Sequence, residues 1–196
     1  MILEKVSEWV EAKYRSTRRP DVVYAHYLDK SIYAVDHEEK LTPQMAVGEL
    51  IHAGVERMLG EPRETCREVP VEPVDSEPAR RFIKEGPRGP YVLLCGTPDA
   101  VVDGRPVEVK TTRRNGSPPR EWATRARIYG YLYAAKAYLV VINVITGHEH
   151  VYELDPLTDE EASKIITAWL RGLYPAPTLP ALAKAGVPHD RDQHTV

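Results

Sequence analysis

The sequence predicts an α/β protein in which a central mixed β-sheet is flanked by helices. Three observations support this prediction. Apolar residues recur at helical spacing in four segments, and strand-like runs lie between them. The dipeptide Asp103-Gly104, a strong signal for a two-residue hairpin turn, joins two of these runs. The longest apolar stretch, residues 138–145, has the length of a buried strand.

Two helices are expected in the first third of the chain. Residues 2–14 form an amphipathic pattern whose apolar side contains Ile2, Val6, Trp9 and Val10. Thr42 and Pro43 favour a helix start, because a hydroxyl caps free N–H groups and proline fits the first helical position. This helix is expected to run to about Leu59 and to end at Gly60. Its predicted core-facing residues are Val47, Leu50, Ile51, Gly54 and Met58.

Two more helices are expected later in the chain. Residues 118–136 carry a stripe at helical spacing, made of Trp122, Ala126, Tyr129 and Tyr133. Thr158 and Glu161 form a capping box for a last helix, whose apolar residues are Ile165, Ile166, Trp169, Leu170 and Leu173. The chain is then rich in Pro and Ala and lacks a core pattern. We therefore predict one domain over residues 1–174 and a Pro/Ala-rich tail over residues 175–196.

Five strands are expected, over residues 64–72, 91–102, 105–112, 138–145 and 148–154. Residues 70–90 are rich in Pro and Glu, which indicates a surface excursion with a short helix near residues 80–84. Residues 21–40 combine Tyr and Val without a clean period, so they receive no assignment.

Composition predicts where the protein resides. No window approaches the ~20 apolar residues that cross a bilayer, so no membrane association is expected. The first residues lack the basic-then-apolar layout of a signal peptide, and we expect a cytoplasmic protein. Asn and Gln are scarce while Pro is frequent, a bias that fits a heat-adapted source. Cys66 and Cys95 are too few for a disulfide framework or a four-cysteine cluster, so we expect two reduced, partly buried thiols.

The hairpin around Asp103-Gly104 gathers acidic residues. Counting outward from a two-residue turn pairs Val102 with Arg105 and, three steps further, Asp99 with Glu108. That last pair is predicted to be a non-hydrogen-bonded one, in which Cα atoms are about 4.5 Å apart. Because side chains alternate along a strand, Lys110 is expected on the same face as the two acids.

Two facing carboxylates repel each other, and burying them without a partner costs several kcal/mol. A divalent cation removes this cost, and oxygen ligands at this spacing suit Mg²⁺ or Mn²⁺. We therefore predict a metal site made by Asp99, Glu108 and the carbonyl of Val109. Lys110 is then placed to position a bound water and to stabilise charge on a phosphate. The alternative is an exposed hairpin that carries a surface cluster of charges.

The motif ending at Asp99, together with Glu108-Val109-Lys110, resembles the signature of the PD-(D/E)XK nucleases. Upstream, residues 48–52 resemble the Gly-x-x-x-His element of the RecB-like branch, which includes the CRISPR-associated exonucleases of the Cas-four family. This resemblance implies a restriction-endonuclease-like fold and makes His52 a further metal ligand. A helix places Gly48 and His52 on one face, where the glycine permits close packing. Glu49 and Glu56 flank His52 at helical spacing and are interpreted mainly as surface charges.

The sequence departs from this family in two ways. The branch carries a Gln-x-x-x-Tyr element after the catalytic strand, and here Arg125 and Tyr129 take those positions. Many members of the CRISPR-associated group hold an iron–sulfur cluster through four cysteines, which this chain lacks, so no cluster is expected. The chain therefore resembles a cluster-free relative or another branch, such as a viral or repair nuclease.

A DNA partner is expected despite the net charge of -3, because binding depends on where charges lie. A basic run follows the proposed catalytic strand, and its predicted DNA contacts, with Tyr129, are Arg113, Arg114, Arg120 and Arg125. The resemblance implies an exonuclease on DNA with free ends, commonly a single strand, acting in repair, recombination or CRISPR adaptation. Two alternatives remain: a weakly active DNA-binding module and a structure-selective endonuclease such as a junction resolvase. Further partners to expect are a second copy of the chain or other nucleic-acid-processing proteins.

Overall fold

The computed structural model describes residues 19–35, 42–60, 62–114 and 117–173, together with Lys5 and Glu8. The helix predicted over residues 2–14, apart from those two positions, lies outside the described residues. The predicted tail over residues 175–196 lies outside them as well.

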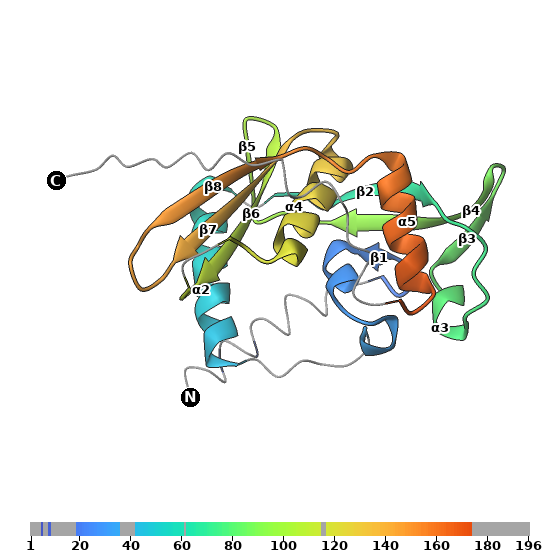
Figure 1. The fold of residues 1–196 in the computed structure, drawn as a ribbon, viewed down its shortest axis with the longest axis horizontal. Coiled ribbons are helices and arrows are strands. Elements are labelled where there is room, and N and C mark those ends of the chain that lie inside the picture. The colour runs from blue at the N-terminus through green and yellow to red at the C-terminus, as the bar shows by residue number, and fades with distance from the viewer. Residues whose placement is uncertain are drawn as a thin grey trace.

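Eight strands form two four-stranded mixed sheets, where the sequence predicted one central sheet (Figure 1). The first sheet contains β1 (Val23–Tyr24), β2 (Thr65–Pro70), β3 (Ile83–Gly86) and β4 (Gly89–Gly96). In it, β4 pairs in parallel with β1 and antiparallel with β2 and β3. The second sheet has the order β5 (Ala100–Val102), β6 (Arg105–Thr112), β7 (Ala137–Asn143) and β8 (Glu149–Leu154). There, β6 and β7 are parallel, and β5 and β8 run antiparallel to their neighbours.

The division into two sheets occurs between Gly96 and Ala100. The sequence predicted one strand over residues 91–102, but residues 97–99 pair with no neighbouring strand. Pro98 lies in this break, and proline has no N–H to donate to a ladder. The chain thus passes from the first sheet to the second directly before Asp99.

Helices fill the space around the sheets. The long ones are α2 (Pro43–Leu59), α4 (Arg120–Tyr133) and α5 (Asp159–Leu170), and α3 (Glu77–Arg80) is a single turn. Two 3₁₀ helices, η1 (Ala25–Asp29) and η2 (Ile32–Ala34), occupy the segment that received no assignment. Figure 1 shows α2 beside β5 and β6, α4 in the middle between the two sheets, and α5 beside the first sheet. No helix in the described ranges combines the length and apolar character needed to cross a membrane.

The sequence predicted most helix ends correctly, because capping is a local property. Thr42 Oγ1 accepts a hydrogen bond from the Met45 N–H at 3.2 Å and starts α2. Thr158 and Glu161 form the predicted reciprocal capping box at the start of α5. The prediction for residues 70–90 was partly wrong, because β3 forms a hairpin with β4 where a surface excursion was expected.

The main hydrophobic core lies between the first sheet, η1, α4 and α5. At its centre the Phe82 and Trp169 rings lie 5.3 Å apart, and Tyr27 stacks on Trp169 at 6.4 Å. The indole N–H of Trp169 donates to the carbonyl of Lys30 at 2.9 Å. Burying the polar end of an indole with a partner avoids the cost of a lost hydrogen bond.

Two smaller cores cover the faces of the second sheet. On one face, Ala123 and Ala126 of α4 pack against Leu139 and Val141 of β7. On the other face, Ile51 and Val55 of α2 pack against an apolar cluster of Ala100, Val107 and Val109. The second sheet is therefore enclosed between α2 and α4, and each of these helices reaches β6.

The predicted core face of α2 is correct for Ile51 but wrong for most of its other residues. Val47, Leu50 and Met58 are 47%, 55% and 83% exposed, while Ile51 and Val55 make the contacts with the sheet. The spacing of apolar residues gave a wrong face because such residues occur around much of this helix, so spacing alone did not identify the buried side. Leu173, expected in the core of the last helix, lies beyond α5 and is 58% exposed.

Candidate active site

The hairpin between β5 and β6 has the predicted turn and the predicted register. Asp103 and Gly104 have φ values of 50° and 75°, the left-handed conformations that a tight hairpin turn requires. Val102 pairs with Arg105, and Ala100 with Val107. The expected next pair, Asp99 with Glu108, does not form. The Asp99 N–H instead donates to the Val107 carbonyl at 3.0 Å, and β5 begins one residue later.

The Asp99 side chain reaches across β6 toward α2. Its Oδ2 accepts a hydrogen bond from the Val109 N–H at 2.7 Å, and its Oδ1 lies 3.3 Å from His52 Nδ1. The strand after the turn and the helix therefore hold one carboxylate between them. This arrangement fixes the orientation of Asp99 although its backbone has left the ladder.

His52 contacts both ends of the predicted metal site. Its Nε2 lies 3.0 Å from the Val109 carbonyl oxygen, while Nδ1 faces Asp99. Helix α2 positions the imidazole through the packing of Ile51 on the apolar cluster of β5 and β6. The glycine one turn earlier is not required by packing, since a Cβ at Gly48 would lie 3.8 Å from Thr111 Oγ1, an ordinary contact.

Glu108 is the most unusual acid of the site, because it is only 2% exposed. Burial, followed by the charge of the nearby Asp99 carboxylate, raises its pKa to about 8. Two cations oppose this effect: Lys110 Nζ lies 2.5 Å and Arg125 Nη1 3.5 Å from Glu108 Oε1. The buried Oε1 of Glu108 is therefore held by two cationic side chains from β6 and α4.

The donors fit a divalent metal ion. His52 Nε2 and the Val109 oxygen form a hydrogen bond of 3.0 Å, which is also the spacing of neighbouring ligands at ~2.1 Å in an octahedral shell. The imidazole would give up its Nε2 proton to bind a metal ion there. The Asp99 carboxylate is close enough to raise the pKa of Glu108, and the two acids complete a set of hard oxygen donors with one imidazole.

Arg125, a predicted DNA contact, is mostly buried and lines the candidate pocket. Its guanidinium forms a close ion pair with Asp29 and a longer contact with Glu108. With these two partners, the Arg125 side chain is only 22% exposed. The arginine therefore acts as an internal cation that connects α4 with η1 and the acidic site.

The rest of the basic run divides between surface and interior. Arg113, Arg114 and Arg120 are exposed, and they remain candidates for phosphate contacts. Arg127 is buried and donates to the carbonyl of Asp155 and to both oxygens of Glu161. It ties α4 to the start of α5, so its role is structural.

Tyr129 is 6% exposed and packs against Gly96, where the sequence predicted a DNA contact. A Cβ at Gly96 would lie 2.7 Å from Tyr129 Cε1, so only glycine permits this approach. Tyr129 thus belongs to the core and to the wall of the candidate pocket. Only DNA that entered this pocket could touch it.

A cavity of about 460 Å³ opens over these groups. Its walls include His52, Asp99, Glu108 and Lys110, the residues that the sequence had grouped, together with Glu49 and Glu56. The sequence did not predict the contribution of η1, which supplies His26 to the wall and Asp29 to Arg125. No local signal marked these two residues, because their segment has no clean period.

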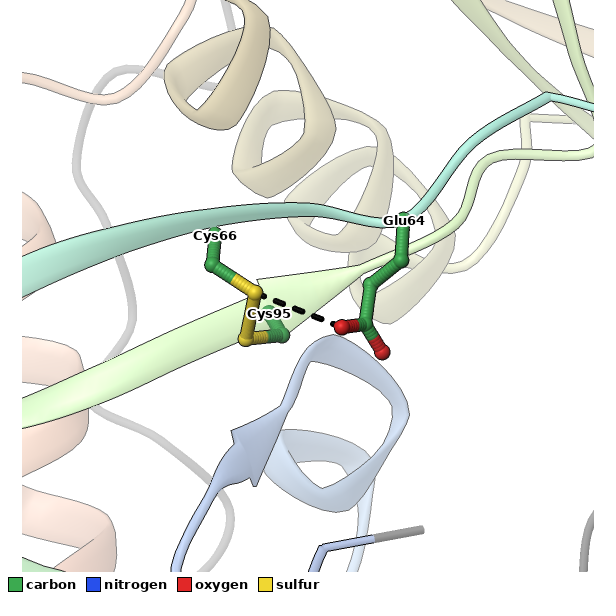
Figure 2. Close-up of side chains that lie close together, drawn as sticks. All are labelled: Glu64, Cys66 and Cys95. Carbon is green, nitrogen blue, oxygen red and sulfur yellow. Dashed lines mark hydrogen bonds between the residues drawn. A yellow bond between two sulfur atoms is a disulfide. The ribbon is translucent and has the colours of Figure 1, made fainter. Parts of the chain in front are cut away.

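The two cysteines are joined in a disulfide, which corrects the expectation of reduced thiols. Cys66 and Cys95 are directly paired across β2 and β4. Figure 2 shows the Glu64 carboxylate beside them, with Oε2 3.4 Å from Cys66 Sγ. Cys66 is exposed, whereas Cys95 is fully buried.

No protein-family model matches the sequence, and no curated protein matches it. Among solved structures, the chain is similar to the crystal structure of SSO0001, with a TM-score of 0.65 and 20% sequence identity. The similarity covers 84% of this chain and 82% of that chain. At this level of identity the likeness shows the fold, and it confirms the mixed α/β class that the sequence predicted.

Proposed function

We propose that this chain is a divalent-metal-dependent nuclease that hydrolyses phosphodiester bonds in DNA. One observation supports this proposal above the others: three donors from α2, β6 and the segment before β5 line one pocket beside Lys110, and a fourth, a backbone carbonyl of β6, contacts one of them. These donors are His52, Asp99, Glu108 and the Val109 carbonyl. Their combination is that of the PD-(D/E)XK signature on which the sequence resemblance rests.

A Mg²⁺ or Mn²⁺ ion, when bound by these donors, would polarise a phosphate oxygen and acidify a bound water. The residues of the chain supply the remaining functions. Asp99 is oriented by the Val109 N–H and by His52, so little reorganisation is needed when a substrate binds. Lys110 is poised to orient the attacking water and to stabilise charge on the phosphate, because its ammonium already lies at the acidic site.

The proposed substrate is DNA with a free end, and a single strand is preferred. The preference for a single strand follows from the resemblance to the RecB-like branch. Exposed Arg113, Arg114 and Arg120 precede or begin α4 and offer phosphate contacts near the pocket. A DNA substrate also favours a cytoplasmic location. The disulfide is compatible with this, since intracellular disulfides are frequent in hyperthermophiles.

The test uses DNA labelled at the 5′ or the 3′ end, single- and double-stranded, with Mg²⁺, Mn²⁺ or EDTA. We expect metal-dependent shortening of linear strands by the natural chain and none by Glu108→Ala. Circular single strands and four-way junctions, offered in parallel, distinguish the alternatives. Cleavage of the circle or the junction would support a structure-selective endonuclease. Binding that persists in EDTA without any product would replace the proposal with a DNA-binding module.

A further inference from the structure

A second cluster of metal-binding side chains lies at the disulfide, and its Glu64 also lines the pocket that contains His52 and Lys110. We propose that reduction of Cys66–Cys95 creates a zinc site in which both thiolates and the Glu64 carboxylate bind one ion. This inference does not depend on the proposed nuclease activity. It concerns ligands of a different chemical class from those of the active site.

The backbone already places the three donors together. Cys66 and Cys95 are opposite residues of neighbouring strands, with Cα atoms 4.1 Å apart. Glu64 directly precedes β2, and its carboxylate points toward the sulfur atoms (Figure 2). One ligand atom from each residue lies within 4.8 Å of the other two. Breaking the S–S bond therefore frees two donors without any change in strand pairing.

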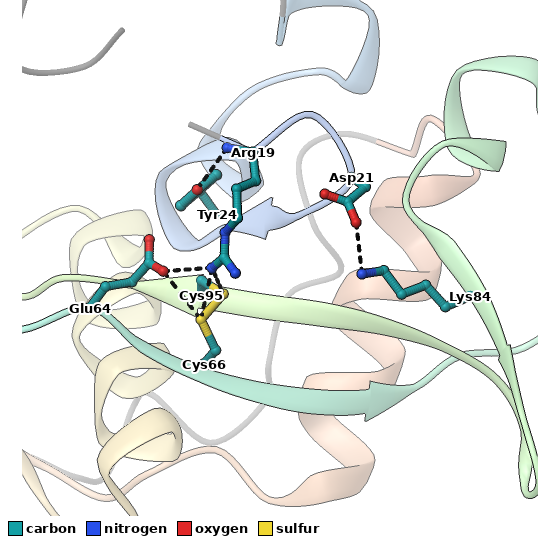
Figure 3. The surroundings of a disulfide bond; sticks show 7 residues. All are labelled: Arg19, Asp21, Tyr24, Glu64, Cys66, Lys84 and Cys95. Carbon is teal, nitrogen blue, oxygen red and sulfur yellow. Dashed lines mark hydrogen bonds and ion pairs between the residues drawn. A yellow bond between two sulfur atoms is a disulfide. The ribbon is translucent and has the colours of Figure 1, made fainter. Parts of the chain in front are cut away.

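A cation already occupies the position between these donors. Arg19 Nη2 lies 2.6 Å from Glu64 Oε2, 3.2 Å from Cys66 Sγ and 3.1 Å from Cys95 Sγ, as Figure 3 shows. The cluster is thus an electron-rich site that attracts positive charge even when the sulfurs are oxidised. Reduction adds up to two negative charges at the same point, which strengthens that attraction.

Arg19 is a displaceable occupant. Its side chain is 45% exposed, so its guanidinium can move into solvent when an ion enters. An exposed ion pair of this kind contributes little to stability, roughly 0.2–1 kcal/mol. We therefore expect Arg19 to compete weakly with a metal ion and to cover the sulfurs when no ion is present.

The donor set selects zinc over the ions expected at the active site. Thiolates are soft ligands that favour Zn²⁺, whereas Mg²⁺ and Mn²⁺ prefer carboxylate, carbonyl and water. Two sulfurs and one carboxylate oxygen leave the fourth position of a tetrahedral zinc ion to water. The chain would then hold a hard-metal site and a soft-metal site that do not exchange ions readily.

The reduction step can be written with an external dithiol as the electron donor. Its thiolate attacks the exposed Cys66 sulfur, the S–S bond breaks, and the electron pair passes to the buried Cys95 sulfur beside Arg19. The second thiol of the reductant then attacks the mixed disulfide and releases Cys66 as a thiolate. The dithiol leaves as a disulfide after giving two electrons, and Zn²⁺ takes the place of the protons on the two thiols.

The experiment uses Co²⁺ as a spectroscopic probe and Zn²⁺ as its competitor. The full chain is studied oxidised, and again after reduction with a dithiol that is removed under anaerobic conditions. We expect a thiolate-to-cobalt charge-transfer band only in the reduced chain, with one Co²⁺ bound and displaced by Zn²⁺. Absence of the band from the folded, reduced chain would overturn the proposal, as would an equal band in Cys66→Ser.

Two further variants test the geometry, because Cys66→Ser also removes the disulfide. Glu64→Gln should weaken Zn²⁺ binding to the reduced chain at least about tenfold, as expected for a lost ligand contact. Arg19→Gln should tighten it by about two- to fivefold, the strength of an exposed ion pair. Glu68→Gln, an exposed position on the same strand, is the matched control. Equal affinities in all four chains would refute the proposal.

A final variant separates this site from the active site. Asp99→Asn removes a ligand of the proposed nuclease centre and should leave the charge-transfer band unchanged, because no sulfur lies at that centre. If Asp99→Asn abolished the band, the absorbing ion would be in the nuclease pocket and the zinc proposal would fail. Failure of DNA cleavage with an intact band would instead affect only the proposed function.

Discussion

The Asp99 carboxylate and the His52 imidazole face each other at 3.3 Å, although one follows the break between two strands and the other lies on a helix. This contact joins α2 to β6 at the point where Val109 offers its carbonyl to the same imidazole. The helix is otherwise held to the sheet mainly by Ile51 and Val55. A functional contact and a packing contact thus coincide, and a metal ion bound here would also fasten α2.

Replacing His52 with Ala is expected to weaken Mn²⁺ binding by roughly 10- to 100-fold, because it removes a ligand and the partner that orients Asp99. Titration calorimetry on the folded variant measures this effect. Arg57→Ala, an exposed change on the same helix, is the control and should bind Mn²⁺ as the natural chain does. Unchanged affinity in His52→Ala would remove the histidine from the ligand set.

Lys110→Ala is expected to slow DNA cleavage by about 10²- to 10⁴-fold, the usual contribution of a group that moves a proton or stabilises charge. Folding and Mn²⁺ binding should persist, because Lys110 donates no ligand atom to the metal. Single-turnover rates at saturating Mn²⁺ test this. Lys84→Ala removes a lysine that pairs with Asp21 elsewhere and should leave the rate unaltered. Full activity of Lys110→Ala would contradict the mechanism.

Glu108 makes the stability of the metal-free chain depend on pH. Its pKa in the folded state is about 8 against an ordinary value of 4.5, so the folded chain binds a proton that the unfolded chain has lost. The stabilisation is complete below pH 4.5 and is lost as the pH rises to about 8, with a slope of up to about 1.4 kcal/mol per pH unit.

Denaturant unfolding in EDTA over this pH range checks the prediction. Glu108→Gln stays neutral at every pH, so it should remove most of the downward slope in the free energy of unfolding. Glu68→Gln, on the exposed side of β2, should retain it. A natural chain that became more stable from pH 5 to pH 8 without metal would show that Glu108 is ionised throughout.

Gly96→Ala is expected to lower the free energy of unfolding by about 1–3 kcal/mol, because its Cβ would lie 2.7 Å from Tyr129 Cε1 in a packed core. Gly54→Ala is the matched control. Its Cβ would meet nothing within 4 Å, and alanine favours a helix by up to about 1 kcal/mol. In thermal or denaturant unfolding, the free energy of unfolding should fall for Gly96→Ala and rise for Gly54→Ala. Equal stability of the two would indicate that the Tyr129 contact can relax freely.

The sequence predicted what depends on neighbours in the chain. The turn at Asp103-Gly104 fixed the register of β5 and β6, and capping residues fixed the starts of α2 and α5. The same hairpin brought Glu108 and Lys110 to one face. These features follow from two-residue and four-residue patterns, in which the local backbone has few alternatives.

Features that depend on distant partners escaped prediction. Arg125 was interpreted as a phosphate contact because its partner, Asp29, lies in a segment without a clean period. The disulfide requires β2 and β4 to align Cys66 with Cys95, and no local pattern sets the register between separate strands. Asp99 left the predicted ladder for a similar reason, since its carboxylate is bound by Val109 and His52 across the sheet.

The break at residues 97–99 gives the site an unusual mechanical position. Asp99 lies in the unpaired segment between the two sheets, whereas Glu108 lies in the middle of β6 in the second sheet. Asp99 is nevertheless tied to β6 through the Val107 carbonyl and the Val109 N–H, so both acids belong mechanically to the second sheet. Gly96→Ala, at the edge of that segment, should therefore destabilise the packing around the first sheet while the two acids keep their spacing.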